Sequence, residues 1–162
     1  MTKKELKPGF YYNGEYKPMS KLSSESLLLE GKNLYQKSVI TKGFAFKSLS
    51  SLPGLLYLKN YDVITSGFFV NANFDSVILQ DVRDIHFLTF AKTNVKNIYF
   101  EGVRTFSLDI FFKTENEINV FFKESKEEIE KINYYLEVTN IENVNVEYNV
   151  SLEKFLERIG EF

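Results

Sequence analysis

The stretch PGLLYLKNYDVITSG, Pro53 to Gly67, is the part of the sequence that decides the fold. It holds three leucines and two tyrosines around a break at Lys59-Asn60, so it is neither a clean helix nor a long alternating strand. We interpret it as two short strands joined near Lys59 to Asp62, with Gly54 and Gly67 marking strand ends.

Similar apolar runs continue on the C-terminal side of this stretch. Each is rich in Val, Ile, Phe or Tyr and is separated from the next by Asn, Asp, Gly or Lys, which is typical of β-strands. The alternation of Phe106 to Phe112, followed by Ile118 to Phe122, predicts an antiparallel hairpin with one side in the core. We find no fixed period of about 20–50 residues among the runs, so we expect no solenoid.

Two helices are expected near the C-terminus. Ser125 and Glu128 form a capping box, and an apolar stripe behind it predicts an amphipathic helix over residues 125–138. After the Asn-rich link TNIENVNVEYN, a second and shorter helix is predicted to start at Ser151 and to end at Gly160. Its apolar stripe consists of Leu152, Phe155, Leu156 and Ile159.

The central part of the chain resembles GRAM domains and bacterial pleckstrin-homology-like domains. The resemblance rests on Glu25 with Leu27 to Leu29, on Gly54 with Leu55 to Asn60, and on the segment Val77 to Ile85. It implies an α+β domain over residues 24–138, an antiparallel pleckstrin-homology-like β-barrel or strongly bent sheet capped by one amphipathic helix. Residues 1–23 would then form an N-terminal arm, and residues 139–162 a C-terminal extension of a strand and a short helix.

Composition narrows the class of protein. The 162 residues fit one domain, and 44% hydrophobic and 16% aromatic residues are too many for a disordered chain. The absence of cysteine excludes disulfides and thiolate metal sites and fits a reducing compartment. The start MTKKELKPGFYY lacks the apolar run of a signal peptide, and no segment approaches about 18 consecutive apolar residues. We therefore predict a cytoplasmic protein, with the inner face of the membrane as the alternative location.

Catalytic chemistry has little support in the sequence. His86 is the only histidine and lies in a strand-like run, where a structural role is more common than a catalytic one. Asp81 and Asp84 fit turn and strand-edge positions, and the glutamates near Ser125 favour the positive end of a helix dipole. No glycine-rich phosphate-binding loop occurs. We predict no enzymatic activity, no metal site and no cofactor.

Two binding functions follow from the pattern of aromatic and basic residues. The first is an adaptor that binds another protein or itself through the aromatic arm and the C-terminal stripe, with Phe10, Tyr11, Tyr12, Leu152, Phe155 and Leu156 as contacts. An inhibitor of a host enzyme, as bacteria or phages use, would show the same features. The second is an anionic-lipid binder, because residues 1–60 carry a net charge of +6 and residues 61–162 one of −8. Its contacts would be Lys32, Lys37, Lys42, Lys47 and Lys59, and the sequence disfavours nucleic acid as a partner.

Overall fold

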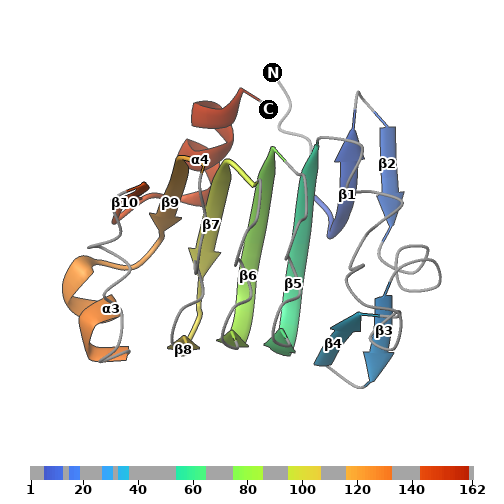
Figure 1. Ribbon diagram of the computed structural model, residues 1–162, viewed down its shortest axis with the longest axis horizontal. Coiled ribbons are helices and arrows are strands. Elements are labelled where there is room, and N and C mark those ends of the chain that lie inside the picture. Colours follow the sequence, from blue (N-terminus) through green and yellow to red (C-terminus); the bar gives the residue numbers. More distant parts are fainter. Residues whose placement is uncertain are drawn as a thin grey trace.

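The structure is a computed structural model that describes residues 6–12, 15–18, 27–30, 33–36, 54–64, 75–85, 95–106, 116–132 and 143–160. Within these residues, ten strands form one sheet (Figure 1). Five of them run parallel, in the order β10, β9, β7, β6, β5, with β10 at one edge of the sheet. They are β5 (Leu55–Ile64), β6 (Ser76–Ile85), β7 (Asn97–Glu101), β9 (Ile118–Phe122) and β10 (Val144–Glu147).

Shorter strands complete the sheet at one side and at one end. β1 (Gly9–Tyr12) and β2 (Glu15–Pro18) are antiparallel, and β1 pairs antiparallel with the first half of β5. β3 (Leu27–Glu30) pairs antiparallel with β4 (Asn33–Gln36), which runs parallel to the last residues of β5. β8 (Thr105–Phe106) pairs with the end of β6. The side of β5 that faces away from β6 is thus paired at both ends, at Leu55 to Tyr57 and at Val63 and Ile64.

The predicted antiparallel barrel is wrong. The central strands pair in parallel, and Ile118 to Phe122 lies beside β7 and not in a hairpin with the run from Phe106, of which residues 107–115 lie outside the described part. The prediction failed because alternating side chains reveal which positions are buried but not the direction of the neighbouring strand. Single buried runs of four to eight residues fit parallel and antiparallel sheets equally well.

Four of the parallel strands, β5, β6, β7 and β9, repeat at a nearly constant spacing, which the sequence interpretation missed. Leu55, Ser76, Asn97 and Asn119 stand beside one another in the sheet, so successive strands are 21, 21 and 22 residues apart. One strand per repeat at this length is typical of repeat proteins such as leucine-rich repeats, whose repeats span about 20–29 residues. Residues that are far apart in the sequence therefore form straight rows across the sheet.

The break at Lys59-Asn60 does not end a strand. β5 continues to Ile64, and Asn60 takes a left-handed backbone conformation with φ of 64°. Asp81 and Gly102, one repeat and two repeats later, have φ of 55° and 72°. Asn, Asp and Gly are the residues that tolerate this conformation best, which explains why the break recurs at this position. We call Asn60, Asp81 and Gly102 the left-handed row.

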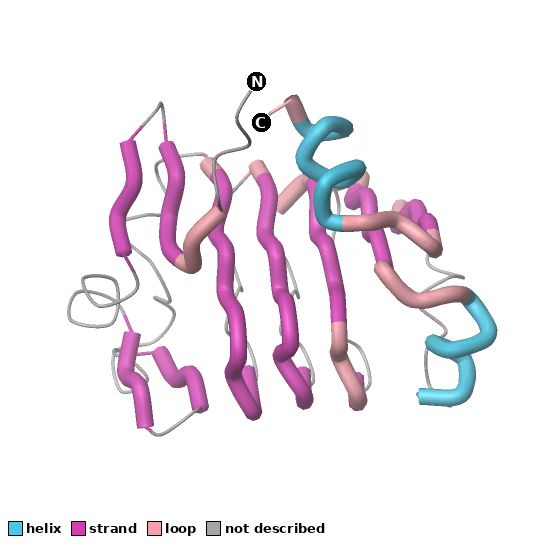
Figure 2. The backbone as a smooth tube through the Cα atoms, turned by 180° about the vertical axis from the view of Figure 1, so that it is seen from behind, coloured by secondary structure: helices cyan, strands magenta, loops and turns pink. Residues whose placement is uncertain are grey.

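Both helices begin where the sequence predicted. α3 (Lys126–Ile132) follows the capping box, in which the Glu128 amide donates to Ser125 Oγ at 3.1 Å and the Ser125 amide to Glu128 Oε1 at 3.4 Å. The rest of the predicted helix, residues 133–138, lies outside the described part. α4 (Leu152–Ile159) is capped by Ser151 and ends at Gly160, as predicted. α4 lies across one face of the sheet, at the end where the parallel strands begin (Figure 2).

A glycine allows β1 to approach β5 closely. A Cβ atom on Gly54 would lie 2.4 Å from the Tyr11 carbonyl oxygen and 3.0 Å from the Phe10 ring. Because the first obstacle is backbone, β1 must move to make room. We expect Gly54→Ala to lower the free energy of unfolding by about 1–3 kcal/mol. Hydrogen exchange should quicken at the β1 amides and stay unchanged in β7, and equal protection of β1 in both proteins would contradict the prediction.

Candidate binding face

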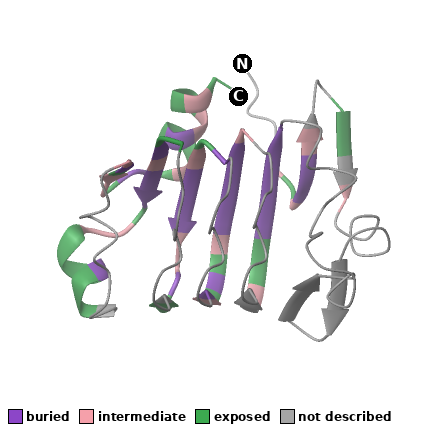
Figure 3. Ribbon diagram, viewed as in Figure 1, coloured by how far each residue is buried: buried purple, intermediate pink, exposed green. Residues whose placement is uncertain are grey.

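The sheet buries side chains on both of its faces. Successive side chains along each strand point to opposite faces. One face, which we call the core face, carries Leu56, Leu58, Val77, Leu79, Ile98, Phe100, Val120 and Phe122. The other face, which we call the helix face, carries Leu55, Tyr57, Ile78, Tyr99 and Phe121. Figure 3 shows that burial is concentrated in the first half of the long strands and that exposed residues follow further along them.

α4 covers the apolar side chains of the helix face over β7 and β9. Phe155 is fully buried, and its ring centre lies 5.2 Å from that of Tyr99 and 5.3 Å from that of Phe121. Arg158 forms a two-pronged ion pair with Glu147 of β10, with N–O distances of 2.7 and 2.8 Å. An aromatic anchor and an ion pair therefore fix both the position and the rotation of α4.

The N-terminal segment covers the same face at its other side. Leu6 and Tyr11 are partly buried and pack in the cluster that includes Leu55 and Tyr57. The Tyr11 hydroxyl donates to the Lys7 carbonyl at 2.7 Å, which holds this segment in a compact turn. Segments from near both ends of the chain thus cover the apolar residues of one sheet face.

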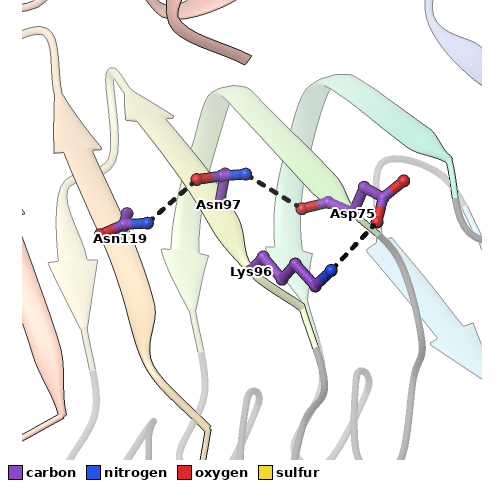
Figure 4. A network of polar contacts seen from close by, with 4 residues as sticks. All are labelled: Asp75, Lys96, Asn97 and Asn119. Atoms are coloured by element: carbon purple, nitrogen blue, oxygen red, sulfur yellow. Dashed lines mark hydrogen bonds and ion pairs between the residues drawn. The ribbon is translucent and has the colours of Figure 1, made fainter.

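Asparagines form a ladder across the first row of the helix face (Figure 4). Asn145 donates to Asn119, and Asn119 donates to Asn97, each at 3.3 Å between the amide nitrogen and oxygen. Asn97 in turn donates to the Asp75 carbonyl at 3.4 Å, and Lys96 lies 4.0 Å from the Asp75 carboxylate. Such amide ladders stabilise stacked parallel strands, and this one has a structural role that needs no ligand.

A second polar network crosses the helix face one row beyond the apolar residues. The Tyr57 hydroxyl donates to Gln80 Oε1, and Gln80 Nε2 donates to Glu101 at 2.6 Å. The other oxygen of Glu101 accepts from the Tyr99 hydroxyl at 2.8 Å. Burial is the main reason why the pKa of both tyrosines lies above its usual value, and the Glu101 carboxylate raises both further.

Tyr57 provides a pH-dependent readout of this network. Burial, with the charges of Glu101 and Asp81, raises its pKa to about 12, above the ordinary value of 10.0. Since the folded state favours the neutral phenol, this contribution to stability is complete below pH 10 and is lost as the pH rises toward 12. We expect tyrosinate absorbance to show late-titrating groups, of which Tyr57→Phe removes one and leaves that of Tyr99. A titration curve that Tyr57→Phe changes only near the ordinary tyrosine pKa of 10.0 would contradict the prediction.

Exposed charged side chains lie next to this network on the same strands. Lys59, Gln80 and Glu101 occupy one row across β5, β6 and β7. Lys123 directly follows β9 and continues this row beside Glu101. Beyond the left-handed row, Arg83 and Arg104 are exposed and directly follow the buried residues Val82 and Val103. We call the six residues the polar belt: Lys59, Gln80, Arg83, Glu101, Arg104 and Lys123.

A shallow hollow lies beside α4, at the opposite end of the helix face from the polar belt. It measures about 410 Å³ and is bordered by the asparagine ladder, Phe121, the Glu147–Arg158 pair and Ile159. Within the described ranges no three His, Cys, Asp or Glu side chains gather as a metal site. In the same ranges no helix is long and apolar enough to cross a bilayer. The described side chains that border the hollow are amides, apolar groups and the Glu147–Arg158 ion pair.

The residues predicted from the sequence to contact a partner differ in how far the structure exposes them. Phe10 is buried in the core face, Tyr11 is half-buried, and the side chain of Tyr12 lies outside the described part. Phe155 is buried and Leu152 and Leu156 are half-buried, all three packed against the chain's own sheet. Lys59 is exposed in the polar belt, whereas Lys32, Lys37, Lys42, Lys47 and the single histidine His86 lie outside the described residues.

Comparison of the chain with protein-family models, with curated proteins and with solved structures finds no match in any of the three. The polar belt is therefore identified from the strand register of this chain and not from a relative. Sequence reasoning missed five of its six residues, because they become neighbours only through the parallel register. The spacing of 21 and 22 residues between successive strands was the signal that could have grouped them.

Proposed function

We propose that the chain is a non-enzymatic binding module that docks onto another protein through the polar belt. The observation that carries this proposal is the belt itself. Four of its side chains stand side by side on adjacent strand positions of one sheet, and exposed Arg83 and Arg104 lie beyond them. Stacked repeats place residues from successive strands on one continuous surface, and repeat proteins use such surfaces to bind partners.

The surroundings of the belt fit a docking surface. The belt borders the apolar residues that α4 and the N-terminal segment cover, and four of its six residues, Lys59, Arg83, Arg104 and Lys123, are exposed. Glu101 and Gln80 are held in place by hydrogen bonds, and pre-positioned groups lose little conformational entropy on binding. Of the lysines proposed to contact anionic lipid, only Lys59 lies in the described part, so no structural observation favours that alternative.

Site-specific photo-crosslinking in an extract of the source organism tests this function. A photo-reactive residue at Gln80 should give a discrete protein adduct that mass spectrometry identifies, and purified partner should then give the same adduct. The matched control carries the same residue at Glu153, which is exposed on α4 away from the belt. Absence of an adduct at Gln80, or identical adducts at both positions, would show that the belt is not a docking surface.

A further inference from the structure

The charged groups of the polar belt and its neighbours differ in how far they are engaged within the chain. Glu101 accepts two hydrogen bonds from Gln80 and Tyr99, and the Glu124 carboxylate accepts from the Gly102 amide at 2.7 Å. Asp84 accepts from the Thr105 hydroxyl at 2.5 Å. Each of these three carboxylates is half-buried at the level of the sheet. Their acceptor positions are thus partly occupied before any partner arrives.

The cations extend outward instead. Lys59, Arg104 and Lys123 are exposed, and within the described residues none of them has an ion-pair partner. Arg83 lies 3.6 Å from Asp84 but is still 53% exposed. The three half-buried carboxylates lie close to the backbone, whereas the longer cationic side chains are exposed to solvent. The belt therefore presents four exposed cations, and among the described carboxylates next to it Asp81 alone is exposed, although the whole chain has a net charge of −2.

We infer that the polar belt binds an acidic segment of another protein, an inference that rests on the proposed function. Lys59 and Lys123 stand at the two ends of the belt, three strand intervals apart, which is about 14 Å at the usual strand spacing. An extended peptide advances about 3.3 Å per residue, so acidic residues about four positions apart would reach both ends. Arg83 and Arg104 lie between these ends, and guanidinium groups suit carboxylates well.

The carboxylates of the belt favour an acidic peptide over a nucleic acid. A phosphate backbone carries closely spaced charges along its whole length, so it would have to pass Asp81, Glu101 and Glu124. A protein segment can place neutral residues opposite those carboxylates and acidic residues opposite the cations. Matching charges in this way gives specificity as well as attraction.

Fluorescence anisotropy with synthetic probes tests the inference. The first probe is a labelled ten-residue peptide with glutamates four positions apart, the second replaces these glutamates by glutamine, and the third is a single-stranded DNA of similar length. We expect the full chain to bind the glutamate peptide in preference to both other probes, and to bind it more weakly as salt is added. Equal binding of the first two probes, or no binding of either, would overturn the inference. Tighter binding of the DNA would identify nucleic acid as the partner and would also overturn it.

Variants locate the binding on the chain. Arg104→Gln combined with Lys123→Gln should weaken glutamate-peptide binding about three- to tenfold, the effect of losing two exposed ion pairs. Lys96→Gln combined with Lys154→Gln removes the same charge from exposed lysines outside the belt and should leave binding unchanged. Equal weakening in both pairs would overturn the inference. If crosslinking at Gln80 captures a partner that the belt variants still bind normally, the acidic-segment inference fails and the proposed function stands. If no adduct forms, the proposed function itself fails.

Discussion

Replacing Phe155 with alanine should lower the free energy of unfolding by about 3–5 kcal/mol, the usual cost of deleting a buried aromatic side chain. Phe155 is the fully buried residue of α4, and its ring contacts Tyr99 and Phe121 on neighbouring strands. An isolated helix of eight residues is not stable in water, so α4 depends on this anchor for its structure. The variant should therefore also expose the two aromatic rings beneath it.

Chemical denaturation with hydrogen exchange measures both effects. The α4 amides should lose protection in Phe155→Ala under conditions in which β5 and β6 keep theirs. Leu156→Ala is the matched control, because Leu156 lies on the same helix but is only half-buried, and we expect a smaller loss of stability. Equal destabilisation by the two variants would show that α4 is not anchored mainly through Phe155.

Local features of the structure were predictable from the sequence. The capping box at Ser125 and Glu128 and the start of α4 at Ser151 depend on side chains within one turn of the helix. Strand positions such as Val77 to Leu79 follow from local runs of apolar residues. These features are set by neighbours in the sequence, so they need no knowledge of tertiary contacts.

The architecture was not predicted, because the decisive signal lies between distant residues. An apolar residue, any residue, a second apolar residue, any residue, and then Asn, Asp or Gly recur at Leu56 to Asn60, Val77 to Asp81 and Ile98 to Gly102. The fourth strand replaces the last residue by Glu124, and its apolar pair is Val120 and Phe122, which obscures the repeat. Each apolar run, taken alone, predicted a strand but not its direction. The resemblance to pleckstrin-homology-like domains then implied antiparallel pairing, which the structure contradicts.

The candidate site depends on the same long-range order. Lys59 was singled out for its charge alone, and its neighbours were then sought in Lys32 to Lys47, close by in the sequence. In the structure its neighbours come from the next repeats, starting with Gln80, which stands beside it in the sheet. Because successive strands are 21 residues apart, polar residues that are isolated in the sequence form a row in the sheet. No local pattern of lysines could reveal this row.

The left-handed row leads to the second large effect, at Gly102. We expect Gly102→Val to lower the free energy of unfolding by about 2–4 kcal/mol, because two costs combine. The backbone there has φ of 72°, a conformation that β-branched residues strongly disfavour. A Cβ atom would also lie 2.7 Å from Asp81 Oδ1, in the neighbouring strand of the stack. Equilibrium denaturation of the variant and the parent chain measures the total.

Two further variants separate these costs. Gly160 has the same φ of 72°, but a Cβ atom there would have no atom within 4 Å, so Gly160→Val should show the backbone cost alone. Gly102→Val in an Asp81→Gly background removes the side-chain clash, and the loss should fall toward that of Gly160→Val. If the double variant loses as much stability as Gly102→Val alone, the contact between the two strands does not contribute. The stacking of Asp81 over Gly102 would then be a consequence of the repeat and not one of the interactions that fix its register.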